Sequence, residues 1–264
     1  MGTTIIAFTA VILYGAGTLL QALRIRSGNQ RAGWLAQFTG VLAIAAHLSF
    51  ALRFMVLEGG VNLSMLVAGT TIAALLAALV LILSLRYPVQ PLLLIAYPIA
   101  LLSILVKLAF YTGPRIIDDS NLGVLLHVSL AITAFSLLAL AAIQAVLLYL
   151  QHHHLKAHHS GFLVRALPPL ETMEALLFGL IHTGVAILTL AIITGAIFVQ
   201  DLFSQQLAHK TVFTLLAWLV FAALILGHQI RGWRGAVASR WTLAGCVLLT
   251  LGYFGSRLVI DVIL

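Results

Sequence analysis

The chain has 264 residues, of which 62% are apolar and only 8% are Asp, Glu, Lys or Arg, and its formal net charge is +7. A water-soluble fold could not bury so much apolar surface, so the composition indicates an integral membrane protein. The positive charge does not indicate nucleic-acid binding, because the basic residues stand singly between apolar runs, as they do in the loops that orient a membrane protein.

Apolar runs of about twenty residues, the length that a helix needs to cross the hydrocarbon core, recur along the chain. They predict an all-α fold, a polytopic transmembrane bundle of about eight spans within a single integral-membrane domain, 1–264. The first run lacks a small-residue cleavage site, so we expect it to be retained. Prolines interrupt the fourth run, but membrane helices tolerate proline. The predicted spans are 4–23, 34–56, 64–85, 91–110, 122–150, 173–199, 211–230 and 241–263.

The distribution of Lys and Arg predicts the orientation, because cytoplasmic loops carry the excess of these residues. Nine of the fourteen lie in alternate loops and five on the other side, so both termini are predicted to lie outside. The nine are Arg24, Arg26, Arg31, Arg86, Lys156, Arg165, Arg231, Arg234 and Arg240.

The presence of a single cysteine limits the cysteine-dependent functions that the protein can have. Cys246 lies within an apolar run, and the chain has no Cys-x-x-Cys redox pair and no Cys-x-x-Cys-His motif for covalent haem attachment. The sequence therefore argues against a thiol oxidoreductase and against a c-type cytochrome.

One group of histidines is predicted to be solvated. The run HHHLKAHH lies in a polar segment, 151–172, that is expected to be a cytoplasmic loop, with a specific metal site as the alternative. His209 is expected in an external loop. The residues of the run are His152, His153, His154, His158 and His159.

Four other histidines lie inside apolar runs, where a polar side chain is costly and usually faces the bundle interior with a partner. By position, His182 and His228 fall in the cytoplasmic half of the membrane, whereas His47 and His127 fall in the outer half. Two histidines at similar depth on different helices are what bis-imidazole ligation of haem iron needs, so the pairs predict up to two haem b sites. Helix-to-helix hydrogen bonds are the alternative.

GHQIRGWRG at 227–235 and LLHVSLAITAF at 125–135 resemble two segments of the cytochrome c assembly protein family, the CcsA- and CcmC-like membrane proteins that handle haem. The histidine before GWRG is the most specific part, and the similarity extends over nearly all of the chain, most closely to the YpjD-like inner-membrane branch. The resemblance implies a multi-pass protein of the bacterial inner membrane. It also implies a role in cytochrome c-type biogenesis, with other cytochrome-assembly membrane proteins as partners.

The resemblance also implies roles for single residues. His228 matches the embedded haem-ligand histidine before the GWRG turn, and His127 matches an outer-face histidine that ligates haem. The family's tryptophan-rich external motif has no counterpart in QDLFSQQLAHK, residues 200–210, and its second outer histidine has none either. The resemblance thus implies a haem-binding core in the membrane that lacks the family's external haem site.

Cationic side chains near both predicted sites are candidates for pairing with haem propionates. Arg231 and Arg234 lie at the predicted cytoplasmic interface, beside the inner pair of histidines. Arg53, Lys107 and Arg257 lie near the predicted outer rim, with pairing of Arg257 to Asp261, four residues further on, as the alternative for that residue.

Three functions fit this pattern. The sequence favours a non-enzymatic haem-binding or haem-translocating membrane protein of cytochrome assembly. One alternative is a membrane accessory or transport protein for divalent cations, whose histidines bind metal or shuttle protons. The other is a transmembrane b-type electron carrier that uses the same histidine pairs as redox centres.

Overall fold

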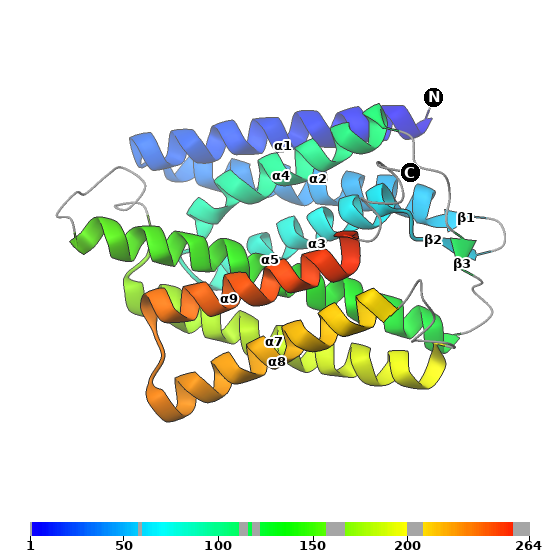
Figure 1. Cartoon of the computed structure of the whole chain (residues 1–264). Helices are drawn as coiled ribbons and strands as arrows, with labels where there is room; N and C mark the ends of the chain where they lie inside the picture. Colours follow the sequence, from blue (N-terminus) through cyan, green and yellow to red (C-terminus); the bar gives the residue numbers. More distant parts are fainter. Residues whose placement is uncertain are drawn as a thin grey trace. The chain divides into compact units, whose positions relative to one another are not determined.

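The computed structural model describes residues 2–57, 60–110, 116–117, 122–156, 167–199 and 208–255. Its contacts group into two compact units, residues 1–120 and 121–264, and each unit contains four long helices (Figure 1). Eight helices among the described residues are long and apolar enough to cross a membrane, which confirms the all-α transmembrane fold. The single integral-membrane domain stays a prediction.

The first unit is a bundle in which each helix packs against the next and α4 packs back against α1 (Figure 1). Pro98 lies inside α4, and Pro91 lies in the 3₁₀ turn η1 before it, so the prolines do not prevent this span. Its helices are α1 (Gly2–Ser27), α2 (Gln30–Met55), α3 (Met65–Arg86), η1 (Gln90–Leu92) and α4 (Leu93–Ala109).

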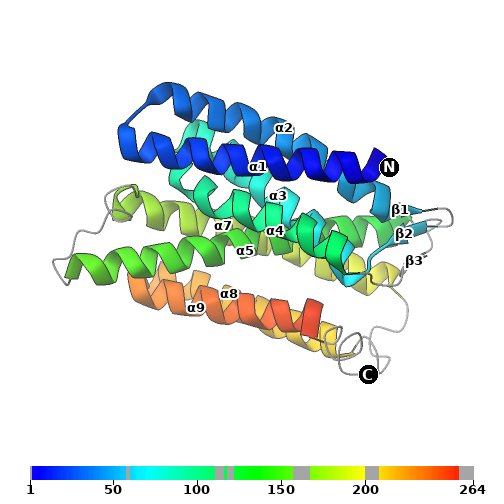
Figure 2. The same cartoon turned by 90° about the horizontal axis from the view of Figure 1, so that it is seen from above.

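A small antiparallel sheet joins two loops of the first unit at the end where α2 and α4 stop (Figure 2). Val61 pairs with Val56 on one side and with Ile117 on the other. The sequence did not predict this sheet, because strands of two or three residues carry no detectable period-two pattern. The strands are β1 (Val56–Leu57), β2 (Gly60–Asn62) and β3 (Ile116–Ile117).

The second unit is a bundle in which α5, α7, α8 and α9 pack in sequence and α9 packs back against α5 (Figure 2). The contacts between α5 and α7 are the most extensive of the chain. Its elements are α5 (Leu122–Lys156), α7 (Leu170–Phe198), α8 (Ala208–Arg231), α9 (Gly235–Thr250) and the π-helical turn η2 (Leu251–Gly255).

Two histidine predictions are corrected by helices that run past the predicted spans. His152, His153 and His154 lie in the last turns of α5 instead of a loop, because no Gly or Pro interrupts that helix after Gly123. His209 lies in the first turn of α8 instead of an external loop. His158 and His159 lie outside the described residues.

Candidate functional site

The turn between α8 and α9 holds His228. Gly232 and Gly235 adopt φ angles of 65° and 55°, which glycine reaches without strain, and so reverse the chain. The backbone N–H of Trp233 donates to the Gly227 carbonyl at 3.2 Å, and Nδ1 of His228 lies 2.8 Å from the Trp233 carbonyl. A carbonyl only accepts, so Nδ1 carries the proton and Nε2 of His228 keeps its lone pair.

His182 on α7 has the same arrangement. Its Nδ1 lies 2.6 Å from the carbonyl oxygen of Phe178, one turn earlier in the helix. The bond assigns the proton to Nδ1 and leaves the lone pair on Nε2. The face of α7 around this imidazole is exposed and carries small residues, because Gly179, Thr183 and Ala186 share it. A Cβ built on Gly179 would meet nothing within 4 Å, so this face leaves room for a flat ligand.

Phe178 brings the two inner histidines to one place. Its ring stacks on the His228 ring with centroids 3.6 Å apart and planes 19° apart. The ring centroid of His182 lies 6.4 Å from that of Phe178. The two imidazoles predicted to form the inner pair are therefore neighbours of the same phenylalanine, on different helices.

A carboxylate that the sequence analysis assigned no function ties this turn to α7. Glu174 accepts from Arg234 Nε at 2.9 Å through Oε2 and from the Gly235 backbone N–H at 2.8 Å through Oε1. Arg234, a predicted propionate partner, is thus already paired, whereas Arg231 is exposed in the last turn of α8.

The spacing along α7 could have identified these neighbours. Glu174, Phe178 and His182 follow one another at four-residue intervals, so they share one face of the helix. The sequence could not predict that α8 packs against that face.

His127 lies on α5, in the same unit but at the far end of α7. Its Nδ1 lies 2.7 Å from the Ala191 carbonyl, so its lone pair is also on Nε2. Gly195 makes this contact possible, because a Cβ there would lie 2.8 Å from Cε1 of the imidazole.

His47 differs from the other three, because both of its ring nitrogens are engaged with side chains in the buried core of the first unit. Ser103 donates its hydroxyl proton to the Ala100 carbonyl at 2.7 Å, so it accepts from the Thr70 hydroxyl at 3.3 Å. Thr70 must then accept from Nε2–H of His47 at 2.8 Å. Nδ1 of His47 therefore accepts from the Tyr14 hydroxyl at 3.2 Å. Binding of iron at either nitrogen would break one of these bonds.

The candidate cations of the outer rim lie in different surroundings. Arg53 is exposed in the last turn of α2. Lys107 is buried in the last turn of α4, and its Nζ lies 4.6 Å above the ring centroid of Phe54, a cation–π contact. Arg257 and Asp261 lie outside the described residues. His47 and His127 belong to different units, so their sharing of one ligand stays a prediction.

Comparison with known proteins identifies the family. Residues 35–264 match the family described as "Cytochrome C assembly protein". The chain belongs to the cytochrome c assembly protein family. This match confirms the resemblance found in the sequence.

Relatives within the family match over different lengths. The inner membrane protein YpjD of Escherichia coli is 31% identical over 262 residues, 97% of each chain. An uncharacterized 28.8 kDa protein of Azospirillum brasilense is 31% identical over 53% of this chain and 52% of its own. The cytochrome c biogenesis protein CcsA of Trichormus variabilis is 30% identical over 34% of this chain and 26% of its own. No solved structure matches the chain.

These relationships indicate the membrane in which the protein lies. The Escherichia coli relative, which matches over 97% of its length, is named an inner membrane protein, and this chain has eight helices of membrane-spanning length and composition in its described part. The protein is a multi-pass protein of the bacterial inner membrane, as predicted.

Proposed function

We propose that the protein handles haem in cytochrome c assembly and that it binds haem b through His182 and His228 in the second unit. Its family and the biogenesis proteins among its partial relatives support the general role. One observation carries the site: both imidazoles adjoin Phe178, and both give their Nδ1 proton to a backbone carbonyl. Such a bond orients a ligating histidine and raises the basicity of its other nitrogen.

The donor set suits haem iron. Haem supplies four equatorial ligands of its own, so the protein must provide only axial ligands, and the Nε2 atoms of His182 and His228 are the candidates. The exposed small residues beside His182 would leave space for the macrocycle, and Arg231 at the end of α8 would pair with a propionate. Arg234 would have to share its guanidinium with Glu174 to do the same.

A bare divalent ion finds less support. A protein site for such an ion usually supplies three or four ligands. Within the part of the chain that the structure describes, no group of three or more His, Cys, Asp or Glu side chains could hold a metal ion. This observation favours haem over direct binding of a divalent cation.

Absorbance spectroscopy tests the proposal. We expect the protein, produced under haem-replete conditions and extracted mildly, to show a Soret band. His228→Gly and His182→Gly should each lower haem occupancy about tenfold or convert a six-coordinate low-spin spectrum to a five-coordinate one, because each removes one axial ligand. Added imidazole should restore the spectrum, and Arg231→Ala should weaken haem retention without changing the spin state.

His154→Gly is the matched control. His154 also has its Nδ1 near a carbonyl, that of Leu150 at 2.8 Å, but it lies in the last turn of α5, and neither of the two ring contacts of Phe178 described above involves it. Its loss should leave the spectrum unchanged. A wild-type protein that carries no haem and binds none on titration would refute the proposal, as would unchanged spectra in both glycine variants. Rapid reversible reduction by a quinol would favour the b-type electron carrier.

A further inference from the structure

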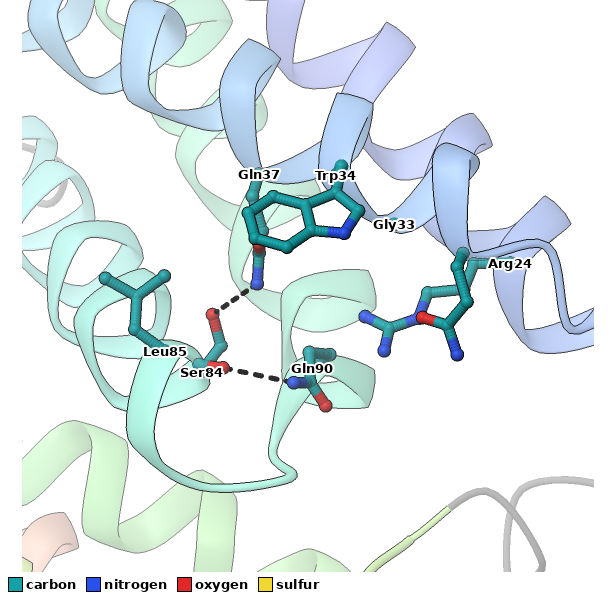
Figure 3. A pocket seen from close by; sticks show the side chains of 8 residues that line it. Arg24, Gly33, Trp34, Gln37, Ser84, Leu85 and Gln90 are labelled. Atoms are coloured by element: carbon teal, nitrogen blue, oxygen red, sulfur yellow. Dashed lines mark hydrogen bonds between the residues drawn. The ribbon is translucent and has the colours of Figure 1, made fainter.

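A pocket of about 210 Å³ opens at the end of the first unit where α1 stops and α2 starts (Figure 3). A water molecule takes about 30 Å³ in the liquid, so the pocket has room for a larger group. Eight residues from α1, α2, α3 and η1 line it. They are Arg24, Gln30, Gly33, Trp34, Gln37, Ser84, Leu85 and Gln90.

The walls of the pocket are held by hydrogen bonds that join α1, α2, α3 and η1, two of which Figure 3 draws. Gln37 Nε2 donates to Ser84 Oγ at 3.4 Å, and Gln90 Nε2 donates to the Ser84 carbonyl at 3.0 Å. The buried Gln21 donates from Nε2 to the Gln90 carbonyl at 2.9 Å. The amide groups are therefore fixed in position before any ligand arrives, which lowers the entropic cost of binding.

The residues that line the pocket carry positive charge and no negative charge. Arg24 is the one charged residue among the eight, and none of them is Asp or Glu. The Arg24 side chain lies across Gly33, since a Cβ built on Gly33 would come within 2.6 Å of its Cδ and 2.8 Å of its Nε. Figure 3 shows this side chain reaching from α1 toward the space below Trp34. A cation with no carboxylate beside it, surrounded by amides, suits an anion with several oxygen acceptors.

The apolar rim indicates the source of that anion. Trp34 and Leu85 line the pocket and are 74% and 68% exposed. One turn deeper on the same helix faces, Phe38 and Ile82 are 62% and 59% exposed. The predicted spans place the pocket where two apolar stripes reach the membrane surface, and a tryptophan at that level is typical of the headgroup layer. On the predicted orientation this is the cytoplasmic leaflet, which carries anionic lipids.

We propose that this pocket binds the phosphate of an anionic phospholipid. The Arg24 guanidinium pairs with the phosphate, the amides of Gln37 and Gln90 contact the headgroup oxygens, and the acyl chains lie along the stripes that Trp34 and Leu85 begin. The site is in the first unit, and it does not depend on the haem site proposed for the second unit.

Native mass spectrometry of the full-length protein in detergent, titrated with phosphatidylglycerol, tests the proposal. We expect one phosphatidylglycerol adduct that survives detergent exchange, and we expect Arg24→Gln to weaken it about tenfold, as the loss of one charge-assisted hydrogen bond predicts. Arg26→Gln is the matched control, because Arg26 is exposed in the same last turn of α1 and does not line the pocket. Equal weakening in both variants, or equal retention of phosphatidylcholine, would overturn the proposal.

Two further measurements keep the test decisive if Arg24→Gln fails to fold. Gly33→Ala retains the charge but displaces the Arg24 side chain, so it should also weaken the adduct. Brominated phosphatidylglycerol should quench the fluorescence difference between wild type and Trp34→Phe more than brominated phosphatidylcholine does. If glycerol phosphate displaces the lipid at equal concentration, a soluble phosphate ester is the ligand and the lipid assignment is wrong.

Discussion

His47 is joined to the other three α-helices of the first unit by one chain of hydrogen bonds. Tyr14 belongs to α1, Thr70 to α3 and Ser103 to α4, and the proton of each donor has one acceptor. A neutral imidazole with Nε2 protonated satisfies the whole chain. These bonds favour the helix-to-helix role that was the alternative for His47, and its ligand role stays a prediction.

Replacing His47 should lower stability without altering bound haem. His47→Leu leaves the buried Tyr14 hydroxyl without its acceptor and the Thr70 hydroxyl without the donor it accepts from, which should cost about 1–3 kcal/mol of unfolding free energy. Ser49→Ala on the same helix should cost little, because the Ser49 hydroxyl is exposed and bonds only within α2. Denaturant unfolding in detergent, followed by circular dichroism, measures both. A lost or shifted Soret band in His47→Leu would instead support the predicted ligand role.

At the scale of elements, α9 begins without a capping side chain of its own. Its N-cap residue, Arg234, makes no side-chain cap bond, and the N–H of Gly235 is instead taken by Glu174 of α7. A carboxylate at a helix N-terminus also interacts favourably with the helix dipole. One side chain thus caps α9 and fixes the α8–α9 turn against α7, close to His228.

Glu174→Ala should therefore destabilise the second unit by about 1–2 kcal/mol, the range for a lost N-cap. Glu174→Gln should retain most of the stability, because its amide oxygen still accepts from the backbone. Arg234→Ala should change stability by less than about 1 kcal/mol, since Arg234 is 63% exposed and exposed ion pairs contribute little. Thermal unfolding in detergent ranks the three variants. A larger loss in Arg234→Ala than in Glu174→Ala would contradict this account.

For the whole molecule, the orientation decides which leaflet each site faces. Single cysteines in a Cys246→Ala background should test it: Ser27→Cys and Arg240→Cys are expected to react with an impermeant maleimide only from the cytoplasm, and Ala109→Cys and His209→Cys only from outside. All four positions are exposed. The reverse labelling pattern would invert every inside and outside assignment made above.

Much of the fold could be predicted from the sequence because a membrane span needs only length and apolar composition. The eight spans followed from that requirement alone, although their ends did not. α5 runs on through His154 because a helix end depends on local breakers and not on where the apolar run stops. The pairing of Val61 with Val56 and Ile117 depends on contacts between two loops, which no local pattern specifies.

The candidate site was only partly predictable. Depth along the spans put His182 and His228 at one level, and the structure places both rings against Phe178. Depth could not distinguish His47, whose nitrogens both bond side chains, from His127, whose Nδ1 bonds a backbone carbonyl. That distinction depends on which atoms face each histidine across helices, information that a single sequence does not carry.

The acceptors that orient His182 and His228 are main-chain atoms, and this limits what substitution can reveal. Every residue type has a carbonyl oxygen, so exchanging Phe178 or Trp233 for alanine removes a ring but leaves the acceptor in place. A screen of side-chain replacements would therefore not detect the groups that select the tautomer. A change in the path of the backbone is needed to remove the acceptor. A one-residue insertion after Gly232, for example, would move the Trp233 carbonyl away from the Nδ1–H of His228.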